Sequence, residues 1–217
     1  MGSTPSLVTE LENRRLGRDF YARPVLRVAR DCLGKMLVHA APDGLAAGII
    51  VEAEAYRGPE DRAAHSYGGR RTRRTEAMFG PPGHAYVFLI YGLHRNFNVV
   101  TGDEGEPHAV LIRAVEPVHG IELMASRRRM DSCRLELTNG PGKLTQALGI
   151  ELRHYGADLC DGPLFLADGP RVRAARSPRI GVEYAGSWAN RPWRFLVPSS
   201  RYVSTTRGAV RGNLGTA

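Results

Sequence analysis

The residues best suited to chemistry in this 217-residue chain lie close together, in the stretch from Glu52 to His65. Glu52, Glu54 and Asp61 supply carboxylates, Tyr56 supplies a phenol and His65 an imidazole. A carboxylate can deprotonate water as a general base, and carboxylates with imidazole can also bind a metal ion. The spacing matches no defined zinc or calcium motif, so we predict a site without a metal.

Two other interpretations of this stretch stay open on these residues alone. Glu54 and His65 could serve only to hydrogen-bond a loop. Alternatively, the acids and the imidazole could form the metal site of a hydrolase, with ligands from Glu52, Glu54, Asp61 and His65.

A predicted β-hairpin positions the acids. Residues 36–40 and 48–56 are strand-like and flank Pro42-Asp43-Gly44, which is typical of a turn. Because successive side chains of a strand point to opposite faces, Glu52, Glu54 and Tyr56 share one face. The other face is small and apolar and is expected to pack, with Ile49, Val51, Ala53 and Ala55.

Further strands and helices are predicted along the chain. Strands are expected at 84–90, 95–101, 109–115, 164–167, 179–182 and 194–197, with a turn at 91–94. Helices are expected at 24–34, 120–130 and 142–148, the last capped by Asn139 with Pro141 in its first turn. This mixture predicts an α+β fold, with a curved, mainly antiparallel sheet, a protruding β-hairpin and peripheral helices. We expect one domain over 1–217, with flexible tails at 1–13 and 207–217.

The charge of the chain favours a polyanionic partner. The formal net charge is +8, and all basic residues except Lys35 and Lys143 are arginines. Six arginines between Arg14 and Arg30 accompany one acid, Asp19, and a second basic run spans 70–74. A basic face binds nucleic acid by neutralising phosphates. A solvated charged surface, or a genomic bias toward arginine, are the simpler alternatives.

Cysteine spacing and hydropathy indicate the compartment. The three cysteines are widely spaced, which argues against a disulfide framework or a structural zinc. No stretch approaches the ~18 apolar residues of a membrane span, and the first thirty residues lack the apolar region of a signal peptide. We therefore expect a soluble intracellular protein without a membrane partner, in the cytoplasm or nucleoid, or in the nucleus of a eukaryote.

The stretch 52–66, EAEAYRGPEDRAAHS, resembles the signature of the alkyladenine (3-methyladenine) DNA glycosylase family. The resemblance covers roughly Arg15 to Ser204 and continues through several segments in the same order: 70–79, 82–92, Asn98, 110–117, 139–144 and 179–182. It implies an enzyme that flips damaged purines out of double-stranded DNA and hydrolyses the N-glycosidic bond in base excision repair. Alkylated purines are the implied substrates, with deaminated or etheno purines as further ones.

The resemblance also implies roles for individual residues. Glu54 corresponds to the general base, and Tyr91 to the side chain that fills the gap left by the flipped nucleotide. The pocket for the base would be formed by Tyr56, His65, Phe88, Asn98 and Arg113. The sequence does not assign individual contacts to the DNA backbone, and we select Arg70, Arg74 and Lys143 as the candidates. The family often has tyrosine where this chain has Phe88, which puts the range of substrates in question.

The lysines bear on the type of glycosylase. Glycosylases that also cut the DNA strand use an amine to form a Schiff base, and the chain has no lysine between Lys35 and Lys143. We therefore predict a monofunctional enzyme. We also expect a monomer without a cofactor, whose partner is double-stranded DNA containing damaged purines. A noncatalytic nucleic-acid-binding module is the alternative, since the arginine clusters and Tyr91 would suffice for binding.

Overall fold

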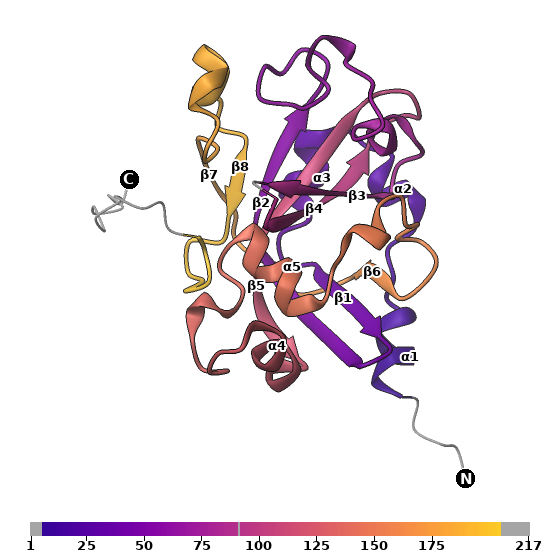
Figure 1. The fold of residues 1–217 in the computed structure, drawn as a ribbon, viewed down its shortest axis with the longest axis vertical. Helices are drawn as coiled ribbons and strands as arrows, with labels where there is room; N and C mark the ends of the chain where they lie inside the picture. The colour runs from indigo at the N-terminus through magenta and orange to yellow at the C-terminus, as the bar shows by residue number, and fades with distance from the viewer. Residues whose placement is uncertain (1–5, 91, 205–217) are drawn as a thin grey trace.

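A computed structural model describes residues 6–90 and 92–204. These residues form a single α+β domain in which a curled antiparallel sheet carries helices on its outside (Figure 1). The predicted fold class is therefore confirmed. No helix in the described part of the chain is long and apolar enough to cross a membrane.

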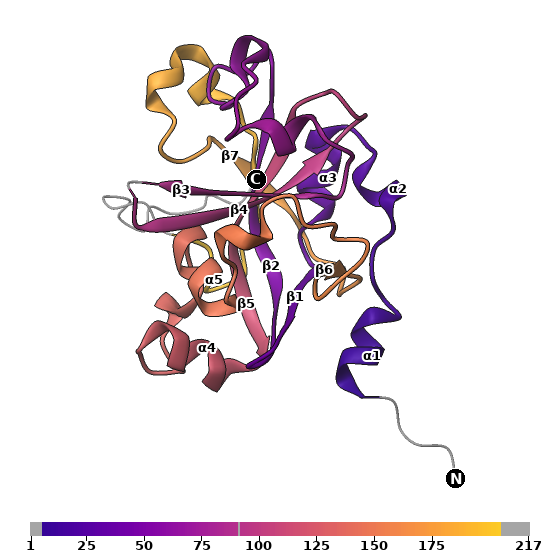
Figure 2. The same ribbon diagram turned by 45° about the vertical axis from the view of Figure 1, so that its right-hand side comes forward.

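The sheet has the strand order β3-β4-β5-β2-β1-β6, with β8 paired to both β2 and β7. Its strands span Met36–Ala41 (β1), Gly44–Arg57 (β2), Ala85–Ile90 (β3), His94–Thr101 (β4), His108–His119 (β5), Leu164–Ala167 (β6), Ala175–Ser177 (β7) and Arg194–Leu196 (β8). Strands β3 and β4 form a hairpin that reaches out from the body of the molecule (Figure 2). Bulges interrupt the pairing of β2 with β5 on either side of Glu52.

Five α-helices lie around the sheet within the described residues: Leu7–Glu12 (α1), Arg18–Tyr21 (α2), Val25–Asp31 (α3), Ile121–Arg128 (α4) and Pro141–Leu148 (α5). Short 3₁₀ turns cover Tyr67–Gly69 (η1), Glu76–Phe79 (η2), Leu135–Leu137 (η3), Leu152–His154 (η4) and Glu183–Asn190 (η5). Helix α1 lies within the expected tail 1–13 and buries Leu11. The expected tail at 207–217 lies outside the described residues.

Helix α5 begins next to the sheet edge that carries the hairpin. Its N-cap is Gly140, not Asn139 as predicted, and Pro141 stands at the first position, as expected. Asn139 instead accepts a hydrogen bond from Lys143 Nζ at 2.7 Å. A lysine four residues ahead thus uses the side-chain oxygen that would otherwise cap the helix.

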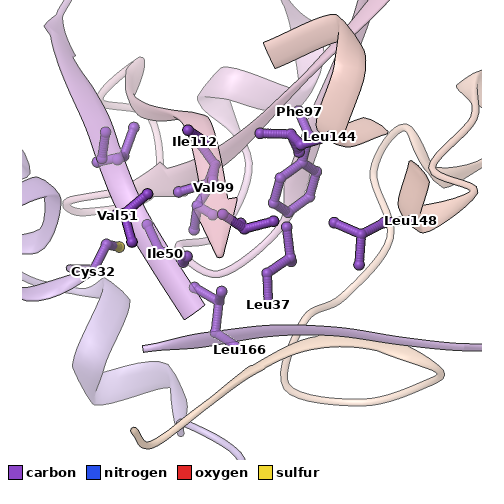
Figure 3. Packing of buried hydrophobic residues seen from close by; sticks show 14 of the residues in the cluster. Cys32, Leu37, Ile50, Val51, Phe97, Val99, Ile112, Leu144, Leu148 and Leu166 are labelled. Carbon is purple, nitrogen blue, oxygen red and sulfur yellow. The ribbon is translucent and has the colours of Figure 1, made fainter. Parts of the chain in front are cut away.

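The hydrophobic core fills the space between the sheet, α3 and α5. Figure 3 shows side chains from β1, β2, β4, β5, α5 and β6 gathered together with Cys32, which directly follows α3; among them are Leu37, Ile50, Phe97, Ile112 and Leu144. All five are fully buried. Removing one such side chain costs about 2–5 kcal/mol because the packed interior cannot collapse into the gap. The core therefore holds the sheet as a rigid frame for the polar residues on its other face.

One predicted strand is absent and another was not predicted. Residues 179–182 form a loop, and the strand in this region is β7 at Ala175–Ser177. The loop follows because the Ile180 N–H donates to Glu54 Oε1 at 2.8 Å, not to a strand partner. A side chain of β2 therefore accepts the hydrogen bond that a neighbouring strand would accept in a sheet.

Candidate active site

A cavity of about 490 Å³ opens between the β3–β4 hairpin, the start of α5 and the loop after residue 179. This volume lies in the range of small-molecule sites. The walls are mainly aromatic and apolar, with a few polar groups. All five residues that were predicted to form the base pocket line the cavity: Tyr56, His65, Phe88, Asn98 and Arg113.

Strand register explains why the pocket residues meet. Tyr86 lies opposite Asn98, and Phe88 opposite Asn96, in the antiparallel β3–β4 pair. Since residues two apart share a face, both aromatic rings point into the cavity together with the amides. Asn98 Nδ2 donates to the Tyr86 carbonyl at 3.0 Å, which fixes the orientation of the amide.

Glu54 lies directly behind the cavity wall and is fully buried. Its Oε2 accepts hydrogen bonds from Tyr56 Oη at 2.9 Å and Arg113 Nη1 at 3.2 Å, and its Oε1 accepts from the Ile180 N–H at 2.8 Å. Each of these three donors belongs to a residue that lines the cavity. The carboxylate is thus held at a fixed place at the back of the pocket. Burial keeps the Tyr56 phenol protonated, because it raises the pKa of that group well above its usual value.

A guanidinium joins Glu54 to the other buried acid of β2. Arg113 Nε donates to Glu52 Oε1 at 2.9 Å, while its Nη1 reaches Glu54. Glu52 is also bonded by Arg194, and Asp61 by Arg179. The carboxylate oxygens thus face cationic and N–H donors. This donor set does not fit the metal-dependent hydrolase, because a cation bound there would face the guanidinium charges.

His65 lines the cavity and is exposed to solvent at its mouth. Its Nδ1 shares a 2.8 Å hydrogen bond with Tyr86 Oη, and its ring packs edge-on against Phe88 with centroids 4.6 Å apart. Loss of hydration lowers the pKa of His65 to about 4, and the guanidiniums of Arg74 and Arg70 lower it further. The ring is therefore neutral at neutral pH.

The loop that carries His65 contacts two other segments, the residue before β5 and the loop at 179–182. Gly58 packs so closely that a Cβ there would lie 2.9 Å from the Pro107 carbonyl oxygen. Asp61 forms a two-armed ion pair with Arg179, whose guanidinium stands 4.8 Å from the centre of the Tyr56 ring. Asp61 was predicted only as a possible metal ligand. Its actual partner lies 118 residues away and carries no local signal.

Comparison with known proteins places the whole arrangement in one family. The methylpurine-DNA glycosylase family model matches residues 19–201. The chain belongs to the methylpurine-DNA glycosylase family. It is therefore a monofunctional DNA glycosylase, a DNA repair enzyme whose substrate is DNA.

Curated relatives of this glycosylase are similar to it in sequence over nearly their full length. A protein of Desulfitobacterium hafniense is 50% identical over 88% of this chain and 98% of its own length. One of Methanocella arvoryzae is 52% identical over 87% of this chain and 95% of its own. One of Bacillus cereus is 48% identical over 85% and 96%. Each is provisionally named a 3-methyladenine DNA glycosylase.

The glycosylase's two arginine clusters differ in their surroundings. In the first cluster, Arg18 pairs with Asp158 at 2.6 Å, 140 residues away, and Arg23 pairs with the nearby Asp31 at 3.0 Å. These two acids neutralise part of the cluster. In the second, Arg70 and Arg74 are exposed, and Arg74 stands over Phe88 with 4.8 Å from its Cζ to the ring centre. Arg71 of this cluster pairs with Glu76, so Arg70 and Arg74 are the cations that this cluster presents beside the cavity.

The fold brings one amine to the cavity of the glycosylase. Lys143 lies on the wall formed by the start of α5, although no lysine is close to Glu54 in sequence. The lysine count alone was therefore an incomplete argument for monofunctional chemistry. Burial lowers the pKa of Lys143, and its Nζ donates to Asn139.

Tyr184 is a residue of the site that the sequence did not predict. Tyr184 lines the cavity, and its Oη donates to the Ala63 carbonyl at 3.2 Å, which links the two loops at the mouth. Sequence spacing could not place it there, because 121 residues separate the two partners. The predicted intercalating residue, Tyr91, lies outside the described residues.

Proposed function

We propose that this glycosylase flips alkylated purines such as 3-methyladenine from double-stranded DNA into the cavity and hydrolyses their N-glycosidic bond with Glu54 as the general base. The observation that carries the proposal is the buried carboxylate, fixed by Arg113, Tyr56 and Ile180 at the back of an aromatic pocket. An aromatic pocket suits an extruded base, and a fixed carboxylate suits hydrolysis of its sugar bond. The product is an abasic site.

The chemistry requires the carboxylate to act on water and on the sugar. A water molecule attacks C1′ of the deoxyribose and gives its proton to Glu54, while the base leaves with the electron pair of the glycosidic bond. Positive charge develops on the sugar ring as that bond breaks, and the buried carboxylate stabilises it. Arg113 and Tyr56 keep the carboxylate aimed at the pocket.

The pocket favours bases that leave without protonation. A purine alkylated at N3 or N7 is cationic and departs as a neutral molecule, so it needs no general acid. His65 is neutral at neutral pH and is not a proton donor for a leaving base. Deaminated and etheno purines are neutral, so we infer that they are slower substrates. Phe88 and Tyr56 would stack on the base, and Asn98 would contact its edge.

The surface around the cavity fits the DNA backbone. Arg70 and Arg74 are exposed beside it, and Lys143 lies on the wall opposite. These cations would bind the phosphates that flank the flipped nucleotide. Tyr91 would fill the gap left in the duplex. A single chain holds all of these residues, so we propose a monomer acting intracellularly on the genome, in a nucleoid or nucleus.

Excision from a defined lesion tests the proposal. We expect release of 3-methyladenine from a methylated duplex in EDTA, and no covalent enzyme–DNA adduct on borohydride reduction. Loss of activity on chelation would favour the metal-dependent alternative. Binding without excision would favour the noncatalytic module. A trapped adduct would show that an amine, with Lys143 as the candidate, attacks the sugar.

A further inference from the structure

The second buried acid of β2, Glu52, has several hydrogen-bond partners, and the proposed mechanism assigns it no role. It is fully buried. Its Oε1 accepts hydrogen bonds from Arg113 Nε at 2.9 Å, Arg194 Nε at 2.6 Å and Ser204 Oγ at 2.8 Å. Its Oε2 accepts from the Ser204 N–H at 2.7 Å. One residue near the end of the described chain thus binds both oxygens.

Arg113 is oriented by this arrangement through all three of its guanidinium nitrogens. Nε is bound by Glu52, Nη2 donates to Ser204 Oγ at 3.4 Å, and Nη1 donates to Glu54. A guanidinium is planar and rigid, so fixing two of its nitrogens fixes the direction of the third. Glu52 and Ser204 therefore determine how Arg113 Nη1 meets Glu54.

The hydroxyl of Ser204 is well suited to this role. It donates to Glu52 and accepts from Arg113, which matches the one donor and two acceptor sites of a hydroxyl. The residue is buried, and its carbonyl oxygen accepts from Arg194 Nη2 at 3.1 Å. The hydroxyl thus bridges Glu52 and Arg113, which are already paired with each other. Arg113 in turn connects it to Glu54, the proposed general base.

We propose that Ser204, with Glu52, is a positioning residue for base excision: it holds Arg113 in the orientation that fixes Glu54. Neither residue touches the DNA or the reacting atoms. Their effect passes through Arg113 and Glu54, so it falls on the rate of the chemical step and not on DNA binding. The inference rests on the proposed function of Glu54.

Ser204→Ala in the full-length chain tests this role, because it removes the hydroxyl and keeps the backbone N–H bond to Glu52. We expect the single-turnover rate of 3-methyladenine release to fall about tenfold, since small misplacements of catalytic groups are costly. Affinity for a duplex with a reduced abasic site should stay within about twofold of wild type, because the change acts on the chemical step. Ser200→Ala is the matched control: it removes a hydroxyl from the same segment, whose partners are Glu116 and Tyr202.

A double variant separates positioning from simple stabilisation. In a Glu54→Gln background there is no general base to hold, so adding Ser204→Ala should cause no further loss of rate. Each variant is assayed well below its thermal unfolding midpoint. If Ser204→Ala does not fold, Glu52→Gln, which keeps the shape of the side chain, takes its place in both comparisons.

Two results would overturn the inference: a wild-type rate in Ser204→Ala, or the same tenfold loss persisting in the Glu54→Gln background. Both results require that the wild-type enzyme excises the lesion, because each rate is compared with the wild-type rate. A wild-type enzyme without excision would instead refute the proposed function. The two failures are therefore distinguishable.

Discussion

Replacing Glu54 by glutamine tests the proposed mechanism most directly. Glu54→Gln keeps the length and shape of the side chain but removes its charge and its capacity to accept a proton. General base catalysis contributes about 10²–10⁴ to a rate, so we expect base release to fall at least ~10²-fold. That loss corresponds to about 2.7 kcal/mol of transition-state stabilisation. Binding to lesion-containing DNA should be retained, because the side chain lies behind the cavity wall.

The structure also gives the cost to stability. An amide oxygen in place of Oε2 would keep the bonds from Tyr56 and Arg113, but its nitrogen would then face the Ile180 N–H. Two buried donors facing each other cost about 1–3 kcal/mol. In a domain of this size, that lowers the unfolding midpoint by about 2–4 °C per kcal/mol. The variant should therefore stay folded at 25 °C.

The assay is single-turnover release of 3-methyladenine with enzyme in excess, together with thermal unfolding of each variant. Glu60→Gln is the matched control: it makes the same substitution at an exposed acid six residues away, which pairs with Arg57 at 3.2 Å. A Glu54→Gln enzyme that releases the base at the wild-type rate would remove Glu54 from the role of general base. A rate loss shared by Glu60→Gln would also refute the reasoning.

Two other predictions follow from the pocket. Phe88→Tyr places a hydroxyl beside His65 and should change the ratio of rates on alkylated and deaminated purines by about tenfold, the effect of one hydrogen bond, with DNA affinity unchanged; equal changes on all lesions would contradict this. The pKa of His65 should lie near 4 when followed by NMR. Because this is below the value of a free imidazole, the group's contribution to stability is complete above about pH 6.5 and declines as the pH falls toward 4. A midpoint above 6 would show that the ring is not desolvated.

Much of the sheet could be predicted from the sequence, because the relevant signals are local. Alternation of apolar and polar side chains located β1 to β5, and Pro42-Asp43-Gly44 marked the turn between the first two strands. The loop at 179–182 could not be predicted. Its backbone is held by Glu54, from a strand more than 120 residues earlier, and no local pattern records such a contact.

The site was predictable only in part for the same reason. The motif around Glu54 is contiguous in sequence and was found, and the family resemblance added Phe88 from a later strand. Arg194 and Ser204 were not, because each reaches Glu52 across more than 140 residues. The charge of the first arginine cluster was overestimated, because only Asp19 was counted against it. Asp31, directly after the cluster in sequence, pairs with Arg23, and the fold adds Asp158 from 140 residues away.

The buried cations next to Glu52, Glu54 and Asp61 are all arginines, and this has a consequence for alkaline conditions. A guanidinium stays charged at every pH at which a protein survives, and its carboxylate partners raise the pKa of Arg113 and of Arg179 still further. A buried lysine in either position would lose its proton far more readily. The charge balance behind the pocket is therefore insensitive to a rise in pH, and hydrolysis should show no alkaline limit arising from these groups.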